Sequence, residues 1–384
     1  MSPVRYDFSS VDAHLQRRAS LYRALGVLPL AIQGSSVLEV AAGSGQNSLY
    51  VATLRPRCLT LLEPNRTGIS DIETLYANQP LPHTHPAVVC AKLEDFQPDE
   101  RFDLVICENW LGCSFHERSL LRKLGTMVAP GGVLVVTAVS PIGFLPNVIR
   151  RGIAARLCIG EDSFDRQTEM LVRAFGPHLQ TMPSMTRSAI DWVHDNMLNP
   201  AYFELSLPIS TVIDELGADF DIIGSSPHFA QDWRWFKSLH GDSRRFNEHF
   251  LDEYFANCHS LLDHRSVRPR GDGAANRALE HAAFHTIEAV REYEAAFRNP
   301  IEDADAIAHA LWHRLGTALA EARATVSRET VDALEQGIDV LQRPNLDVEA
   351  VATADAFAGL FGRETLYVSF ERAITRGATP GEAQ

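Results

Sequence analysis

The residues best suited to chemistry lie in a glycine turn and in an acid that follows the next apolar run. Residues 37–40 are apolar except for Glu39, as expected for a parallel strand buried on both faces. Gly43 and Gly45 then allow a sharp backbone turn into a helix, whose free N–H groups could bind a ligand. Residues 59–62 form a second apolar run ending in Glu63, where a carboxylate would accept hydrogen bonds from a ribose. The pattern predicts a nucleotide-binding corner.

These segments resemble motif I and the acidic loop of the class I S-adenosylmethionine-dependent methyltransferases. Residues 39–45 read Glu-Val-Ala-Ala-Gly-Ser-Gly, with Ala41 in place of the family's first glycine. The resemblance continues through residues 102–108, which match the family's fourth strand, and residues 128–136, which hold a Pro-Gly-Gly turn into the fifth. It implies a Rossmann-like fold and S-adenosyl-L-methionine as the cofactor.

The same resemblance implies which residues bind that cofactor. The turn after strand three receives the adenine, and Lys92 replaces the family's usual acid there, so Glu94 or Asp95 would have to act instead. Residues after strand four touch the methionine end and the substrate, and Trp110 could either form a wall beside the sulfonium or serve only in packing. The implied cofactor-binding residues are Glu39, Ala41, Gly43, Gly45, Gln46, Asn47, Glu63, Pro64, Leu93, Glu94, Asp95, Glu108, Asn109 and Trp110.

Two histidines are candidates for a general base, which methyl transfer needs only when the acceptor is an alcohol or an ammonium. His194 lies three residues after Asp191 and directly before Asp195, and a carboxylate beside it could tune it. His116 begins a predicted helix. For each, a solvated surface position is the alternative. Residues 225–235, rich in aromatic and polar groups, could contact substrate or dock a helical insertion.

Composition restricts the partners. The net charge of −14 argues against a nucleic-acid backbone as the main partner, because binding phosphates requires clustered Lys and Arg. His83 and His85 have no Cys or acid beside them, so no metal site is predicted. Six cysteines without a CxxC pair indicate a cytoplasmic protein without structural disulfides. No apolar run is long enough for a membrane span, so no membrane partner is expected.

The predicted fold is α/β: a Rossmann-like, doubly wound, seven-stranded sheet with an antiparallel last strand and large helical insertions. Strands are expected at 36–40, 58–62, 87–90, 103–107, 132–139 and 220–226, and the seventh at 365–370. The expected parts are an N-terminal helix (1–28), the cofactor-binding core (29–141), a helical substrate cap (142–205), a core helix with strand six (206–227), a helical insertion (228–362) and strand seven with the tail (363–384).

The sequence therefore predicts a methyltransferase that uses S-adenosyl-L-methionine to methylate an oxygen or nitrogen of a small-molecule metabolite. One alternative is methylation of a protein or an RNA. Another is a non-catalytic member of the fold that only binds the cofactor, since fold alone does not fix function. The substrate, the methylated atom and the oligomeric state stay open at this point.

Overall fold

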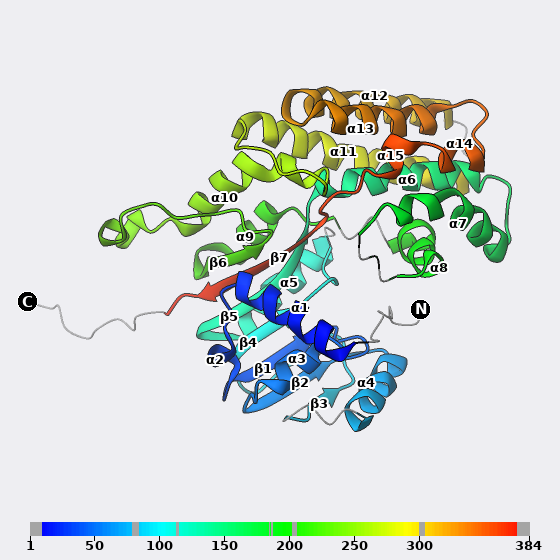
Figure 1. Ribbon diagram of the computed structural model, residues 1–384. Coiled ribbons are helices and arrows are strands. Elements are labelled where there is room, and N and C mark those ends of the chain that lie inside the picture. The colour runs from blue at the N-terminus through cyan, green and yellow to red at the C-terminus, as the bar shows by residue number, and fades with distance from the viewer. Residues whose placement is uncertain are drawn as a thin grey trace, which may run out of the picture. The chain divides into compact units, whose positions relative to one another are not determined.

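The computed structural model describes residues 10–78, 84–112, 115–183, 185, 187–201, 206–298 and 304–374 (Figure 1). The chain divides into two compact units. The first comprises Met1–Ala138, Ile209–Phe250 and Leu366–Gln384, and the second comprises Val139–Pro208 and Leu251–Thr365.

The first unit is built on one sheet of seven strands in the order β3-β2-β1-β4-β5-β7-β6. The neighbouring strands among β1 to β5 pair in parallel, and β6 and β7 pair antiparallel. The fold class predicted from the sequence is confirmed. The strands are β1 (Ser36–Val40), β2 (Cys58–Leu62), β3 (Ala87–Val89), β4 (Phe102–Cys107), β5 (Val128–Val139), β6 (Phe220–Ser226) and β7 (Thr365–Arg372).

The centre of the sheet is buried because its strands are apolar on both faces. Val37 of β1 lies opposite Leu59 of β2 on one side and Leu104 of β4 on the other. All three side chains are almost fully buried. Burying such residues supplies most of the stabilisation, roughly 1.5–3 kcal/mol for each large aliphatic side chain.

The strand nearest the C-terminus enters the sheet, as predicted. β7 lies between β5 and β6, and its Phe370 pairs with Ile222 of β6. β6 is therefore an edge strand, and Asn247 protects part of that edge. Its side chain accepts from the Ile222 N–H at 2.9 Å and donates to the Phe220 carbonyl at 2.8 Å, which satisfies backbone groups that could otherwise pair with another chain.

Six α-helices belong to the first unit within the residues described. Ser10 caps the first of them by accepting from the Ala13 N–H, and the end of that helix packs closely on β6. A Cβ on Gly224 of β6 would stand 2.8 Å from the Ala24 carbonyl oxygen, so only glycine fits. The helices are α1 (Val11–Ala24), α2 (Pro29–Ile32), α3 (Ser48–Thr53), α4 (Arg66–Asn78), α5 (Phe115–Met127) and α9 (Ile209–Leu216).

The second unit is mainly helical. Its centre is α6 (Pro141–Leu157), which begins at the cap Ser140 and packs against α11 and α13. The other helices are α7 (Phe164–Gln180), α8 (Ala189–Trp192), α10 (Phe246–Asn257, which starts in the first unit), α11 (Gly273–Arg298), α12 (Ala304–Thr325), α13 (Arg328–Gln342), α14 (Val348–Ala352) and α15 (Asp355–Ala358).

Two consecutive arginines of α6 are fully buried, and their partners explain why this is tolerated. Arg151 forms a double hydrogen bond with Glu294 of α11, at 2.9 and 3.0 Å. Arg150 donates to the carbonyls of Leu360 and Phe357, at 2.8 and 3.0 Å. A guanidinium group has five donors and no acceptor, so it suits backbone carbonyls near a helix end, where fewer N–H groups of the helix are available to them.

No helix within the described ranges has both the length and the apolar character needed to cross a bilayer. Cys58, Cys90, Cys107, Cys158 and Cys258 are free thiols.

Candidate active site

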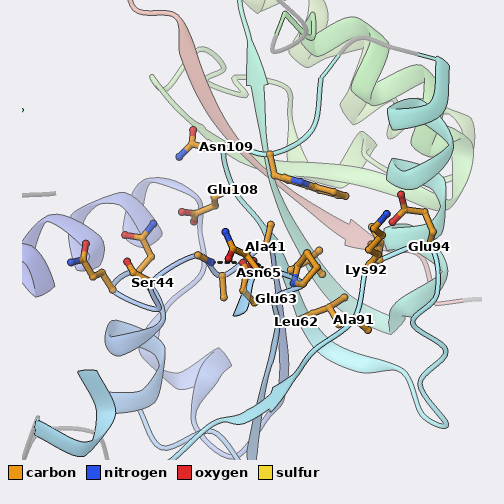
Figure 2. A pocket seen from close by; sticks show the side chains of 18 residues that line it. Ala41, Ser44, Leu62, Glu63, Asn65, Ala91, Lys92, Glu94, Glu108 and Asn109 are labelled. Carbon is orange, nitrogen blue, oxygen red and sulfur yellow. Dashed lines mark hydrogen bonds between the residues drawn. The ribbon is translucent and has the colours of Figure 1, made fainter. Parts of the chain in front are cut away.

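A cavity of about 510 Å³ lies at the carboxyl ends of β1, β2, β3 and β4 (Figure 2). Open α/β sheets bind ligands at this edge. Ser44 and Glu108 lie toward one end of the cavity, and Lys92 and Glu94 lie toward the other (Figure 2). The lining residues are Val40, Ala41, Ala42, Gly43, Ser44, Gln46, Asn47, Leu62, Glu63, Pro64, Asn65, Ala91, Lys92, Leu93, Glu94, Glu108, Asn109 and Trp110.

The glycine turn after β1 adopts left-handed backbone angles. Gly43 has φ +60° and Gly45 has φ +74°. A Cβ on Gly43 would meet nothing within 4 Å, so that side faces open space in a turn that lines the cavity. A Cβ on Gly45 would lie 2.9 Å from Ile72 of α4, so Gly45 serves helix packing and does not line the cavity.

Ala41 also lies in the left-handed region, with φ 57°. This is the position where the resembling family has its first glycine. An alanine Cβ in that region costs roughly 1–2 kcal/mol because it approaches the following carbonyl. The turn therefore holds a strained residue directly at the cavity wall.

Glu63 connects the turn after β1 to the loop after β2, and both segments line the cavity. Its Oε2 accepts from the Gly43 N–H at 2.8 Å, and its Oε1 accepts from the Asn65 N–H at 2.9 Å. Only 6% of the residue is exposed. α4 passes so close that a Cβ on Gly68 would stand 2.7 Å from the Gly43 carbonyl oxygen and 3.1 Å from the Glu63 Cγ. Gly68 thus shapes the site, although the sequence pattern did not single it out.

α1 contributes a buried polar stripe to the same site. Arg18 donates to both carboxylate oxygens of Glu108, at 2.8 and 2.7 Å, and also to the Tyr22 hydroxyl. The side chains of Arg18 and Glu108 are 8% and 4% exposed. One turn earlier, the His14 Nε2 is 3.0 Å from the Gln46 carbonyl oxygen in the glycine turn. Positions four apart on a helix share one face, so α1 holds the turn and the end of β4 together.

Glu39 lies beneath this cluster and does not line the cavity. Burial raises its pKa to about 7, and the nearby Glu108 carboxylate adds to the shift, while Ser48 and Arg18 oppose it. For Arg18, burial alone would lower the pKa, but the Glu108 carboxylate makes the net shift upward. The cluster therefore has one arginine for two carboxyl groups, and Glu39 keeps its proton into the neutral range.

The turn after β3 supplies the far wall. Leu93 is buried, and Lys92, Leu93 and Glu94 all line the cavity. Asp95 is exposed and does not line it, and its N–H donates to the Lys92 carbonyl. Of the two acids predicted as alternatives here, Glu94 is the one placed at the cavity.

The cavity brings together most of the residues predicted from the sequence. Glu39, Gly45 and Asp95 are the predicted residues that do not line it. The sequence motifs did not indicate Val40, Ala42, Ser44, Leu62, Asn65, Ala91 and Lys92 as site residues, although all line the cavity. Each lies within two positions of a predicted residue, so extending the motifs by one or two positions would have found them. Arg18 and His14 carried no signal, because they contact the site only through the packing of α1.

The structure describes the surroundings of His194 but not those of the His116 side chain. His194 belongs to the second unit. Its Nε2 is 3.1 Å from the Thr168 Oγ1, and its ring packs against Phe164. The expectation that His194 lies beside Asp191 assumes α-helical winding throughout; Asp191 lies in α8, and His194 lies in the π-helix Val193–Leu198 that follows it. His116 lies in α5, and its side chain is outside the described part of the structure.

Asp195 interacts electrostatically with both His194 and Asp191, and each acid also has a further partner. The Asp191 carboxylate accepts from the Ser188 hydroxyl at 2.8 Å, and the Asp195 carboxylate forms an ion pair with Arg187 at 3.0 Å.

The cavity fits a polar nucleotide-like ligand. The Gln46 Oε1 is buried and has no hydrogen-bond partner among the described residues, although a buried acceptor normally has one. A ligand ammonium or hydroxyl group would satisfy it. Within the same described residues, no group of three or more His, Cys, Asp or Glu side chains could hold a metal ion.

Comparison with known proteins finds similarity over the part of the chain that holds the site. Residues 37–132 match the model of a family described as a methyltransferase domain. An uncharacterized methyltransferase of Mycobacterium tuberculosis is 32% identical over 116 residues, which cover 30% of this chain and 55% of that protein. The ribosomal RNA small subunit methyltransferase G of Laribacter hongkongensis is 32% identical over 83 residues, which cover 21% of this chain and 39% of its own.

Among solved structures, the N-methyltransferase NodS from Bradyrhizobium japonicum in complex with S-adenosyl-L-homocysteine is 18% identical, with a TM-score of 0.27. That match covers 35% of this chain and 74% of NodS. The chain spans about half the length, or less, of the curated relatives it matches.

The strain at Ala41 gives a stability prediction. Ala41→Gly removes the left-handed penalty of roughly 1–2 kcal/mol, while the added freedom of glycine in the unfolded chain costs roughly 0.4–1 kcal/mol. We expect a net gain of about 0.5–1 kcal/mol in the free energy of unfolding, measured by urea denaturation without ligand. Ala42→Gly is the matched control, because Ala42 is not among the positive-φ residues, and it should destabilise. A loss of stability in Ala41→Gly equal to that of the control would contradict the strain.

The buried Glu39 gives a pH prediction. The unfolded chain loses this proton near its ordinary value of 4.5, and the folded chain loses it at about 7. Between these values the folded state binds more protons, so its stability falls as pH rises. Glu39→Gln has no proton to lose, so its stability relative to wild type should rise by roughly 3 kcal/mol between pH ~4.5 and ~8.

Urea denaturation across this pH range measures that difference. Glu100→Gln, at an exposed position, controls for the loss of one carboxylate charge. If the stability curves of wild type and Glu39→Gln run parallel from acid to neutral pH, Glu39 is not a buried acid with a raised pKa.

Proposed function

We propose that the protein uses the methyltransferase domain matched at residues 37–132 to transfer a methyl group from S-adenosyl-L-methionine to an oxygen or nitrogen of a small-molecule metabolite. The observation that carries the proposal is the cavity at the strand ends, in which a buried carboxylate, a glycine turn and an unsatisfied amide oxygen converge. When bound, S-adenosyl-L-methionine supplies a methyl group on a positively charged sulfur.

Binding and orientation are the work we assign to the lining residues. Glu63 would accept from the ribose hydroxyls with lone pairs not used by the Gly43 and Asn65 N–H groups, since each carboxylate oxygen can accept more than one hydrogen bond. Glu94 and the backbone of Leu93 would hold the adenine. The remaining implied contacts also line the cavity; they are Ala41, Gly43, Gln46, Asn47 and Pro64.

Glu108, Asn109 and Trp110 form the end of the cavity assigned to the methionine part. Arg18 fixes the Glu108 carboxylate with two hydrogen bonds, and the Thr137 hydroxyl fixes the backbone of Asn109 by accepting its N–H at 2.8 Å. A fixed carboxylate and the face of an indole both favour positive charge. We assign the ammonium group to Glu108 and the sulfonium side to Trp110.

A small-molecule acceptor is the part of the proposal that rests on charge. With a net charge of −14 the chain would repel a polyphosphate backbone. The free thiols fit a reducing compartment, and we place the protein in the cytoplasm on that basis. The alternative acceptor is RNA, since one relative is named as a ribosomal RNA methyltransferase.

The general base stays a proposal. A carboxylate or phenolate acceptor needs only positioning, whereas an alcohol or ammonium acceptor needs a base. We keep His194 and His116 as its candidates, because both are histidines whose ordinary pKa lies near neutrality.

Cofactor binding is tested by Glu63→Ala. Charge-assisted hydrogen bonds contribute roughly 1.5–3 kcal/mol each, so losing two should weaken S-adenosyl-L-methionine binding by about a hundredfold or more. Isothermal titration calorimetry measures the change. Lys92→Ala is the matched control, since Lys92 lines the same cavity without being assigned a side-chain contact. Binding by Glu63→Ala within twofold of wild type, in a protein that still unfolds cooperatively, would refute the assignment.

The acceptor class is tested by salt. Formation of S-adenosyl-L-homocysteine with a metabolite extract should change little between ~50 and ~200 mM salt, whereas binding dominated by phosphates falls by about three or more orders of magnitude. A steep salt dependence, or turnover only with RNA fractions, would favour the alternative. Cofactor binding without turnover on any fraction would favour a non-catalytic protein.

A further inference from the structure

Two histidines on α11 stand close together on the surface of the second unit. His281 and His285 are four residues apart on α11, which places them on one face of the helix. Their Nε2 atoms are 3.0 Å apart, and their ring centroids are 4.2 Å apart. His281 is exposed, and the His285 side chain is 31% exposed.

An acid on the same helix fixes the tautomer of one ring. The Glu288 Oε2 is 2.8 Å from the His285 Nδ1. A carboxylate only accepts hydrogen bonds, so the Nδ1 carries a proton, and in the neutral ring the Nε2 of His285 then presents a lone pair. The Nε2 of His281 must then donate to it. The second ring nitrogen of a metal-binding histidine is usually held in this way by a carboxylate.

The spacing of the two nitrogens also suits a chelated ion. Metal–imidazole bonds are about 2.0–2.1 Å long, so two nitrogens 3.0 Å apart would subtend about 90–97° at a shared ion. That angle is close to the right angle between neighbouring ligands in square-planar and octahedral complexes. It is smaller than the tetrahedral angle that zinc prefers in structural sites. Cu²⁺ is also the divalent ion that nitrogen ligands bind most tightly.

We propose that His281 and His285 form a two-histidine site for a divalent copper ion on α11, with Glu288 orienting His285 and water completing the coordination. Binding leaves His285 in its present tautomer. His281 moves its proton from Nε2 to Nδ1 by exchange with water, so both Nε2 lone pairs face the ion and no net proton is released. The site is independent of the cofactor cavity, and a bound ion would link two successive turns of the helix.

The chain contains an internal comparison for this site. His309 and His313 on α12 have the same spacing and are both exposed. The His309 Nδ1 is hydrogen-bonded to the Asp305 carbonyl at 2.7 Å. Within the described residues, the two imidazoles of this α12 pair form no hydrogen bond with each other. If spacing alone mattered, both pairs would bind equally.

A titration of the full-length protein with Cu²⁺ near neutral pH tests the proposal. Glycine is added as a competing ligand, because the chain has 15 histidines and weaker sites must be suppressed. Electron paramagnetic resonance should show one ion per chain bound by two nitrogen ligands. His281→Ala and His285→Ala should each weaken that ion at least tenfold. Glu288→Ala should weaken it about 10–100-fold, as loss of an orienting partner does.

His313→Ala is the matched control and should leave the affinity within twofold of wild type. Far-UV circular dichroism checks that each variant keeps its helix content. The proposal is overturned if His281→Ala and His285→Ala bind the ion within twofold of wild type. It is also overturned if His313→Ala loses the same ion. Unchanged affinity in Glu288→Ala would remove the orienting role of Glu288.

Discussion

The carboxylate of Glu63 is the contact on which the geometry of the cavity depends. It accepts one backbone N–H from the glycine turn after β1 and another from Asn65, at the end of the loop between β2 and α4. The pairing of β1 with β2 continues as far as the Ala41 N–H, which donates to the Leu62 carbonyl at 2.9 Å, and the Glu63 carboxylate connects the two segments beyond that point. The close approach of Gly68 keeps α4 pressed against this contact. Gly43 and Asn65, which both line the cavity, therefore hold their positions without a ligand.

A second constraint is the uneven charge of the cluster below the cavity. Arg18 balances Glu108, and Glu39 remains without a counter-charge of its own. Burying the Arg18–Glu108 ion pair costs desolvation free energy, and removing one partner of a buried pair typically lowers the free energy of unfolding by roughly 3–5 kcal/mol. The pair therefore need not add to the net stability of the fold, and its main effect is to orient the Glu108 side chain. Arg18 fixes the carboxylate at the end of β4, and α1 is tied to the site through Arg18 and His14.

The second unit solves the same problem with backbone acceptors. Arg150 satisfies the carbonyls of Phe357 and Leu360 at and beyond the end of α15, and Arg151 meets the Glu294 carboxylate. In both units, then, buried arginines connect segments that are far apart in sequence. These contacts join residue pairs such as 150 and 360, which no local pattern relates.

The sequence by itself determined the strands and most of the cavity. Apolar runs such as 37–40 and 59–62 are buried on both faces, so their composition is sufficient to identify them. The glycine turn, Glu63 and residues 108–110 follow directly from strand ends, and parallel strands bring their carboxyl ends to one edge. Strand β7, which follows β6 by more than 130 residues in the sequence, could also be predicted, because residues 365–370 combine β-branched and aromatic residues after a turn.

Only the tertiary structure decided the contacts made by helices. Arg18 lies on α1, and its partner Glu108 comes 90 positions later, so no spacing rule connects them. His194 lies in the π-helix Val193–Leu198, a winding that residue spacing does not indicate, because the backbone hydrogen bonds set it. The sequence also did not predict the positive φ of Ala41, because alanine disfavours that angle. The hydrogen bonds of Glu63 and of β1 with β2 hold the turn in this conformation.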